Sequence, residues 1–344
     1  MFKLKSKSKK NELNGKKFTI NFKKIVVFLI FMCMLSTVTV PVLIFYGPFE
    51  NLKRIVVGTS WNTLKHQWIA RIFLSDEAIH NILGETYAQD PTEQGGEIQM
   101  LEFTNKHTDK IEVYNIESDD FEGKMLLIYD PTRVGVGFSS KMPRSGETTS
   151  AIAKKNGAIA AINAGGFMDA QWAGTGGAPM GFIIKNNELI YDQLNNRDLK
   201  QETVAFTEKG MLIVGKHSIT QLLSIGVKEA VSFGPPLIVN GKPTISKGDG
   251  GWGIAPRTAI GQREDGVVLL LVIDGRSLKS HCATLRDVQD ILLQYKAVNA
   301  VNLDGGSSTT MYYDGKIINR PSDALGERTV PTAFIVMPSE EGGR

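Results

Sequence analysis

The chain has 344 residues, 42% of them hydrophobic, and a net charge of +3 at pH 7. This length and composition exclude a disordered or low-complexity chain and supply enough apolar residues for one large domain or two ordinary ones. The positive charge is local, because residues 1–24 carry nine lysines and one glutamate, which leaves 30 basic and 35 acidic residues beyond them. The folded part therefore lacks the clustered positive field that nucleic acids require, and we expect no nucleic-acid partner.

Residues 1–24 are predicted to form a basic cytoplasmic tail. The next residues, 25–46, form an uncharged apolar run of 22 residues. A helix of that length spans a hydrocarbon core of about 30 Å. The pattern predicts a single-pass membrane helix, with the N-terminus in the cytoplasm and residues 47–344 outside the cell. A cleaved signal peptide is the alternative, but the run is longer than the apolar region of a signal peptide.

Residues 47–96 are predicted to form a helical stem and a linker. Apolar residues recur at helical spacing over residues 59–84, with a break at Ser75 and an end at Gly84. Proline and two glycines in residues 85–99 are typical of a linker.

From residue 97 the pattern changes to strands and turns, which predicts a domain over residues 97–338 and a short tail over residues 339–344. Three hairpins are predicted, because Asn-Asn, Asn-Gly and Asp-Gly pairs at 186–187, 240–241 and 314–315 each lie between apolar flanks. A short helix is predicted over Thr148–Lys155.

The clearest crossover lies between residues 267 and 304. An apolar strand ends at Asp274, a helix is predicted to begin at Thr284 with Asp287 completing a capping box, and a second strand ends at Asp304. Two parallel strands would bring Asp274 and Asp304 to one sheet edge. The predicted class is α+β: a mixed β-sheet domain with hairpins and one βαβ crossover, preceded by one transmembrane helix and a helical stem.

A third apolar strand, over residues 158–162, ends on Asn163 just before Gly165 and Gly166. Strands that each end in a polar residue followed by glycine can deliver polar groups to one edge, where α/β sheets often bind ligands.

The candidate catalytic residues are three carboxylates, Asp304, Asp274 and Glu327. Arg257, Arg276 and Arg328 stand close to acids and glycines, which suggests bidentate capture of an anion such as a phosphate. The structural alternative is that Asp304 caps a turn and that the arginines form ion pairs.

The chain lacks the sequence motifs of several other enzyme classes: it has no phosphate-binding Walker sequence, no Gly-x-Ser-x-Gly and no His-Glu-x-x-His. His281 and Cys282 could form a nucleophile pair, but a loop pair facing solvent is the default interpretation. No cofactor is expected. A divalent metal at Asp274 and Asp304 is conceivable, although two carboxylates do not specify one.

Six segments, in order along residues 97–338, resemble the phosphodiester glycosidase family. They are Asn163-Ala164-Gly165-Gly166-Phe167, Phe233-Gly234-Pro235-Pro236-Leu237, Pro256-Arg257-Thr258-Ala259-Ile260-Gly261, Asp274-Gly275-Arg276, residues 302–311 and Glu327-Arg328-Thr329-Val330-Pro331. The chain departs from the family at Ala164, where a glycine is common, and this difference concerns the shape of that loop.

The resemblance implies hydrolysis of a sugar-1-phosphodiester at the glycosidic carbon, in an envelope glycan or a teichoic-acid-like polymer, with N-acetylglucosamine as the expected sugar. Asp304 would activate water or stabilise the cationic centre, with Asp274 as the second acid or base, and the three arginines would spread the phosphate charge. Asn163, the amides of Gly165 and Gly166, and Ser307 would orient sugar or phosphate oxygens.

Two alternatives stay open. One is a metal-dependent phosphodiesterase that cuts the bond between phosphorus and oxygen. The other is a non-catalytic glycan-binding module in exopolysaccharide or envelope assembly.

Overall fold

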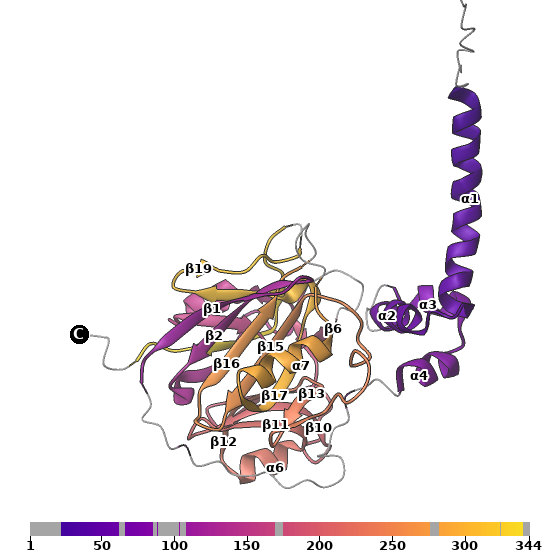
Figure 1. The fold of residues 1–344 in the computed structure, drawn as a ribbon. Helices are drawn as coiled ribbons and strands as arrows, with labels where there is room; N and C mark the ends of the chain where they lie inside the picture. Colours follow the sequence, from indigo (N-terminus) through magenta and orange to yellow (C-terminus); the bar gives the residue numbers. More distant parts are fainter. Residues whose placement is uncertain are drawn as a thin grey trace, which may run out of the picture. The chain divides into compact units, whose positions relative to one another are not determined.

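A computed structural model describes residues 22–61, 66–84, 88, 103, 108–168, 175–275, 282–323 and 325–339 (Figure 1). The predicted linker, apart from Ala88, and the end of the C-terminal tail lie outside the described residues. The chain divides into two compact units, residues 1–53 and residues 54–344, and each is considered by itself.

In the first unit, α1 (Phe22–Tyr46) is the one described helix long and apolar enough to cross a membrane, over Lys23–Tyr46. Hydroxyl groups of Ser36, Thr37 and Thr39 donate to backbone carbonyls one turn earlier, so they do not need water as a partner. An apolar helix this close to the N-terminus fits either a membrane anchor or a signal sequence.

The predicted helical stretch before the domain forms α2 (Glu50–Trp61), α3 (Gln67–Phe73) and α4 (Asp76–Gly84). The break falls at Ser75, as predicted, and the Ser75 hydroxyl accepts a hydrogen bond from the Ala78 amide in the first turn of α4.

Three antiparallel sheets build the domain, and the strands of each are given in spatial order. The first sheet holds β1 (Ile111–Glu117), β2 (Glu122–Ile128), β16 (Val268–Ile273), β15 (Arg257–Arg263), β17 (Ala297–Leu303), β13 (Pro236–Val239) and β14 (Lys242–Pro243). The second holds β11 (Leu212–His217), β10 (Gln201–Thr207), β12 (Val227–Val231), β8 (Phe182–Lys185) and β9 (Glu188–Asp192). The third holds β19 (Lys316–Ile317), β18 (Met311–Tyr313), β5 (Ala160–Asn163), β21 (Thr332–Val336) and β3 (Val134–Phe138).

Two short ladders complete the strands: β20 (Thr329–Val330) pairs with β4 (Glu147–Thr148), and β6 (Phe167–Met168) pairs with β7 (Ala178–Pro179). Single 3-10 turns occur at η2 (Pro131–Arg133) and η3 (Gly306–Ser308).

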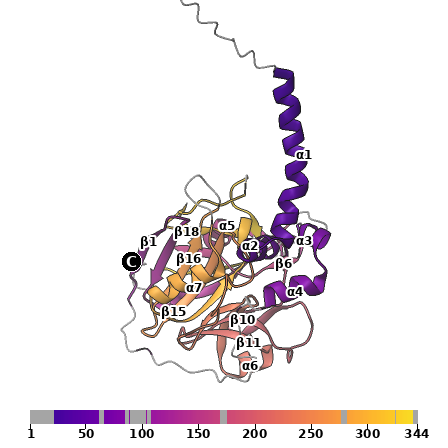
Figure 2. The same cartoon turned by 45° about the vertical axis from the view of Figure 1, so that its right-hand side comes forward.

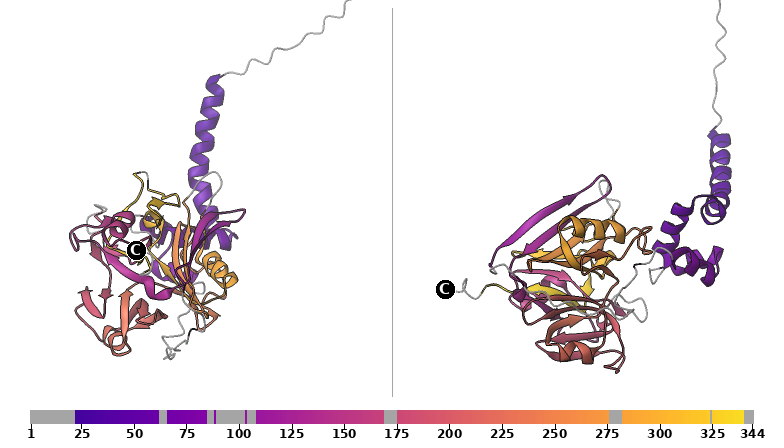
Figure 3. Two further views of the ribbon diagram at one scale, coloured as in Figure 1. Left: turned by 90° about the vertical axis from the view of Figure 1, so that its left-hand side faces the viewer. Right: turned by 60° about the horizontal axis from the view of Figure 1, so that its bottom comes forward.

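The main hydrophobic core lies where the inner faces of the three sheets meet, with Leu270, Val301, Ile162, Phe334 and Phe206 among its fully or almost fully buried members. Each outer face is covered by one helix: α7 (Leu285–Gln294) on the first sheet, α6 (Ile219–Ser224) on the second and α5 (Thr149–Lys155) on the third. Figure 2 shows α7 and α6 over their sheets, and Figure 3 shows the layers from two further sides.

The α+β class is confirmed, and the three predicted hairpins form as β8–β9, β13–β14 and β18–β19. Asn186, Asn187, Asn240 and Asp314 have positive φ, as tight hairpin turns require. The predicted capping box is present in α7, where Thr284 and Asp287 each accept the other's backbone amide.

The prediction of a mixed sheet is wrong for the described residues, in which every strand pair is antiparallel. The strands on either side of the predicted crossover, β16 and β17, run in the same direction, but β15 lies between them and is antiparallel to both. The β15 strand precedes β16 in sequence and joins it as a hairpin, so the apolar pattern of residues 267–304 gives no sign of it.

Buried amide side chains join the sheets. Gln262 of β15 is fully buried, accepts from the Leu212 amide at 2.7 Å and donates to the carbonyls of Gly210 and Gly266 at 2.7 and 3.1 Å. Since Leu212 belongs to the second sheet, this side chain ties the first sheet to the second.

Gln262→Ala should lower the free energy of unfolding of residues 47–344 by about 2–4 kcal/mol, because it leaves three buried backbone groups without partners. Denaturant unfolding followed by circular dichroism measures the change. The control is Gln294→Ala at the exposed end of α7, which should change stability by less than about 0.5 kcal/mol. Equal effects of the two substitutions would contradict this account of how the sheets are joined.

Candidate active site

The site lies at the end of the first sheet where the inner strands β16 and β17 finish and β15 begins. In the register, Arg257 pairs with Ile273 and Thr258 pairs with Leu303, so the two strands end at the same level. Asp274 and Asp304 follow these strands. Two strand spacings of about 4.8 Å separate their backbones by about 10 Å.

Asp304 is half-buried, and its backbone is held by neighbouring loops. Its amide donates to the carbonyl of Ala164 at 3.0 Å, which joins the end of β17 to the loop that follows β5. Gly305 must lack a side chain, because a Cβ there would lie 2.7 Å from the Pro256 carbonyl oxygen. The carboxylate accepts from the Ser308 hydroxyl and the Gly305 amide.

Burial raises the pKa of Asp304 to about 6, because removal from water penalises the charged form. The Ser308 hydrogen bond, the positive charge of Arg328 and the Gly305 amide act in the opposite direction and only partly offset this effect. A carboxyl group whose pKa lies near 6 can change protonation at physiological pH, as an acid or base catalyst must.

Asn163 holds this loop through the hydrogen bonds of its side-chain amide. The side chain is fully buried, its Nδ2 donates to the Asp304 carbonyl at 2.5 Å, and its Oδ1 accepts from the Thr258 hydroxyl at 2.8 Å and the Thr310 amide at 3.1 Å. The sequence predicts that Asn163 orients substrate oxygens. In the structure its side-chain amide is hydrogen-bonded within the protein, to the backbone of Asp304 among other groups.

Of the two predicted arginines that the structure describes, Arg328 is the one whose charge acts on Asp304. Its Nη1 donates to the Ser307 hydroxyl at 2.8 Å, and its guanidinium carbon lies 4.8 Å from the centre of the Phe167 ring. Its charge also lowers the pKa of Asp304. Stacking on Phe167 holds the planar guanidinium in one orientation, so an anion would meet a fixed donor group.

Arg257 is the first residue of β15, and its guanidinium binds backbone carbonyls and not the expected anion. Its guanidinium is buried and donates to the carbonyls of Ala283, Trp252 and Gly253. Burial lowers its pKa to about 10. The strand pattern around Arg257 gave no sign of these carbonyls, two of which belong to the loop just before β15 and one to the segment before α7. Arg276 and His281 lie outside the described residues, so the third arginine and the His-Cys pair stay predictions.

Asp274 is almost fully buried, and desolvation raises its pKa above the ordinary value for an aspartate. Its Oδ1 accepts from the Arg320 amide at 2.8 Å, and its Oδ2 lies 3.8 Å from the Arg320 Nε. Asn319 donates to it as well. Sequence reasoning missed Asn319 and Arg320, because neither stands in a distinctive motif.

Glu327 uses its carboxylate at the first turn of α5, where it accepts from the Ser150 amide at 2.9 Å and the Ser150 hydroxyl at 2.5 Å. A carboxylate at a helix N-terminus is electrostatically favourable. This contact fixes the segment that carries Arg328, so we interpret Glu327 as a positioning residue and not as a catalytic one.

Gly165 and Gly166 allow close packing of the loop between β5 and β6. The Gly165 amide donates to the Thr332 hydroxyl at 2.9 Å, so the predicted amide donor to substrate is occupied there. A Cβ on Gly166 would lie 2.6 Å from the Phe233 ring. Ser308 and Phe167 were missed as site residues, although both stand inside the motifs that carry the family resemblance.

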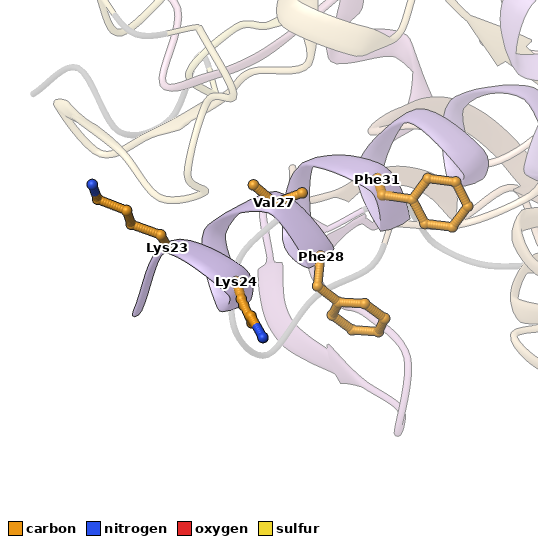
Figure 4. A pocket seen from close by; sticks show the side chains of 5 residues that line it. All are labelled: Lys23, Lys24, Val27, Phe28 and Phe31. Atoms are coloured by element: carbon orange, nitrogen blue, oxygen red, sulfur yellow. The ribbon is translucent and has the colours of Figure 1, made fainter. Parts of the chain in front are cut away.

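Within the described residues, no group of three or more histidine, cysteine, aspartate or glutamate side chains is arranged to hold a metal ion. A hollow on α1 is lined by Lys23, Lys24, Val27, Phe28 and Phe31, and Figure 4 shows that all five project from one helix. These are apolar and lysine side chains of the candidate membrane span, and they offer no catalytic group.

The fold and the site together define a class of protein. It is a sheet-rich α+β domain in which a titratable aspartate lies beside an arginine that stacks on a phenylalanine ring. The sequence profile described as phosphodiester glycosidase matches residues 156–337, more than half of the chain. The chain belongs to the phosphodiester glycosidase family.

The chain is also similar to individual curated proteins. The SPbeta prophage-derived uncharacterized protein YomE of Bacillus subtilis is 31% identical over 265 residues, which is 74% of this chain and 38% of that protein. The N-acetylglucosamine-1-phosphodiester alpha-N-acetylglucosaminidase of Bos taurus is 39% identical over 70 residues, or 20% of this chain and 13% of that protein. The chain thus matches well under half the length of these curated relatives.

Among solved structures, the zebrafish N-acetylglucosamine-1-phosphodiester alpha-N-acetylglucosaminidase catalytic domain, auto-inhibited by its pro-peptide, superposes with a TM-score of 0.60. The superposition covers 73% of this chain and 91% of that one at 21% sequence identity, a likeness of fold.

The raised pKa of Asp304 predicts a pH-dependent effect of Asp304→Asn on stability. Between about pH 4 and pH 6 the unfolded aspartate is ionised while the folded one still holds its proton, so wild-type stability falls as pH rises. Asparagine carries no such penalty. The stability of the variant relative to wild type should therefore increase from pH 4 to pH 7.

Chemical denaturation of residues 47–344 at several pH values measures this difference. Glu188→Gln, at an exposed position in β9, is the control for loss of one carboxylate. A difference between Asp304→Asn and wild type that does not change with pH would show that Asp304 is not held in a desolvated setting.

Proposed function

We propose that this protein is a hydrolase that cleaves a sugar-1-phosphodiester between the sugar C1 carbon and the phosphate oxygen. The observation that carries the proposal is the position of Asp304: a desolvated carboxylate, hydrogen-bonded by Ser308, beside the guanidinium of Arg328. Family membership supplies the reaction class, and this pair supplies groups suited to it.

In the proposed reaction, the bond from C1 to the bridging oxygen breaks and its electrons stay on the phosphate. A water oxygen bonds to C1 and its proton passes to the Asp304 carboxylate. A phosphate monoester is a better leaving group than an alcohol, so a positive charge that disperses the developing negative charge can replace much of a general acid. Arg328, fixed by Phe167 and Ser307, is the group we propose for this role.

The other predicted residues act through these two in our proposal. Asn163 positions Asp304, and Glu327 positions Arg328, in each case by hydrogen bonds to the surrounding backbone. Asp274, with its raised pKa, is the second acid or base candidate at the same sheet edge. Arg276, which follows Asp274 after one glycine, is proposed as a further phosphate ligand.

The proposed setting is the outer surface of the cell membrane. The apolar length of α1 and the nine lysines of residues 1–24 favour an anchor with its N-terminus in the cytoplasm. The substrate we propose is an envelope glycan or teichoic-acid-like polymer that carries an N-acetylglucosamine-1-phosphodiester, the linkage in the name of the bovine relative.

Product analysis tests the reaction. The full-length chain in mild detergent, incubated with a nucleotide-linked N-acetylglucosamine, should release free N-acetylglucosamine at the same rate with and without a chelator. Asp304→Asn should reduce that rate by at least about 100-fold. Release of N-acetylglucosamine-1-phosphate, abolished by the chelator, would favour a metal-dependent phosphodiesterase. No turnover on a range of sugar phosphodiesters, with function in the cell kept by Asp304→Asn, would favour a glycan-binding module.

A further inference from the structure

A group of partly exposed apolar side chains lies beside the loop that supports Asp304. A Cβ on Gly166 would lie 2.6 Å from the Phe233 ring and 3.5 Å from the Met180 sulfur, so both side chains pack directly on this glycine. The Phe233 ring meets the Trp252 ring at an angle of 64°, with 6.4 Å between their centroids. We call Phe233, Trp252 and Met180 the apolar rim.

The rim is open to solvent on one side. Phe233 packs against the main core and Trp252 against the core under α7, yet both remain only half-buried. The Met180 side chain is 48% exposed. Large apolar side chains that stay exposed beside a polar site are typical of a binding surface.

Two loops connect the rim to the catalytic pair. In the first, Ala164 accepts the Asp304 amide and Gly166 meets the rim, while Phe167 stacks under Arg328. The rim and the guanidinium thus contact neighbouring residues of one short segment.

In the second loop, Trp252 and Gly253 give their carbonyls to Arg257, and Pro256 accepts the Gly306 amide at 2.9 Å. The Arg257 guanidinium therefore fixes the backbone that carries Trp252 next to the Asp304 loop. This gives the buried arginine a positioning role at the rim.

We propose that Phe233 and Trp252 bind the sugar ring of the substrate and that Met180 borders its acyl substituent. A pyranose has an apolar face of C–H groups, which packs well on an aromatic ring. With the phosphate at Arg328 and C1 at Asp304, the ring extends toward Gly166 and the rim. This inference deepens the proposed function and rests on it for the placement of C1.

The test uses the full-length chain in detergent with two probes, N-acetylglucosamine and inorganic phosphate. Intrinsic tryptophan fluorescence reports sugar binding without turnover, and inhibition of hydrolysis reports phosphate binding. Phe233→Ala and Trp252→Ala should each weaken N-acetylglucosamine binding about tenfold or more, while inhibition by phosphate changes less than about twofold. Sugar binding to the Trp252 variants is read as competitive inhibition of hydrolysis, because they lack the Trp252 fluorescence.

Trp252→Phe keeps an aromatic face and guards against misfolding of the alanine variant. It should retain most of the sugar affinity, read as competitive inhibition by N-acetylglucosamine, and lose the part of the fluorescence change that arises from Trp252. Trp68→Ala, at a tryptophan that is 59% exposed in α3, is the matched control and should bind both probes as wild type does.

The outcomes separate the two levels of the proposal. If wild type hydrolyses the substrate but both alanine variants bind N-acetylglucosamine as wild type does, the rim assignment is overturned and the proposed function stands. If wild type binds the sugar through the rim without hydrolysing the phosphodiester, the rim assignment stands and the proposed reaction is wrong. Failure of wild type to bind N-acetylglucosamine at all would overturn the rim assignment.

Discussion

The buried amide of Asn163 is the interaction on which the site depends. One side chain, at the end of β5 in the third sheet, bonds to Thr258 of β15 in the first sheet and to the backbone at Asp304 and Thr310. Thr258 and Thr310 are fully buried and Asp304 is half-buried, so breaking this set would leave buried polar groups without water or protein partners. The place where the two sheets meet and the place where Asp304 leaves its strand are therefore fixed by the same residue.

Two opposing effects act on the pKa of Asp304, and they differ in size. Burial favours the protonated carboxyl, whereas Ser308, Arg328 and the Gly305 amide favour the carboxylate. Burial is the larger effect, and the resulting pKa of about 6 makes the group a better base than an exposed aspartate while leaving it ionised at neutral pH. Arg328 contributes its charge from a position that Phe167 and Ser307 hold rigidly.

Local patterns in the sequence predicted the features that depend on local interactions. The hairpin turns, the capping box of α7 and the strand ends at Asp274 and Asp304 follow from turn chemistry and apolar periodicity. The insertion of β15 between β16 and β17 depends on pairing between distant segments, which periodicity does not report. For the same reason the mixed sheet was predicted where an antiparallel one forms.

For the site residues too, the sequence predicted some roles and not others. Motif and strand position indicated Asp304 and Arg328 as members of a site, and the structure places them together. Glu327 and Arg257 carry the same residue types in equally distinctive motifs, but their partners are Ser150 and three loop carbonyls. Charge and motif alone did not distinguish a side chain that faces an anion from one that holds a loop, because the difference lies in contacts that form only in the folded chain.

The measurement that tests this account most directly is the pH dependence of kcat/KM for release of N-acetylglucosamine, compared in wild type, Arg328→Gln and Arg197→Gln. Arg197 is an exposed arginine in the loop before β10 and serves as the control. We predict that wild-type activity falls as pH drops through about 6, where Asp304 takes up its proton. Removal of the Arg328 charge should raise the pKa of Asp304, so the acidic limb should move to higher pH in Arg328→Gln and stay in place in Arg197→Gln. An acidic limb at the same pH in all three proteins would contradict the pairing of Asp304 with Arg328 as the catalytic centre.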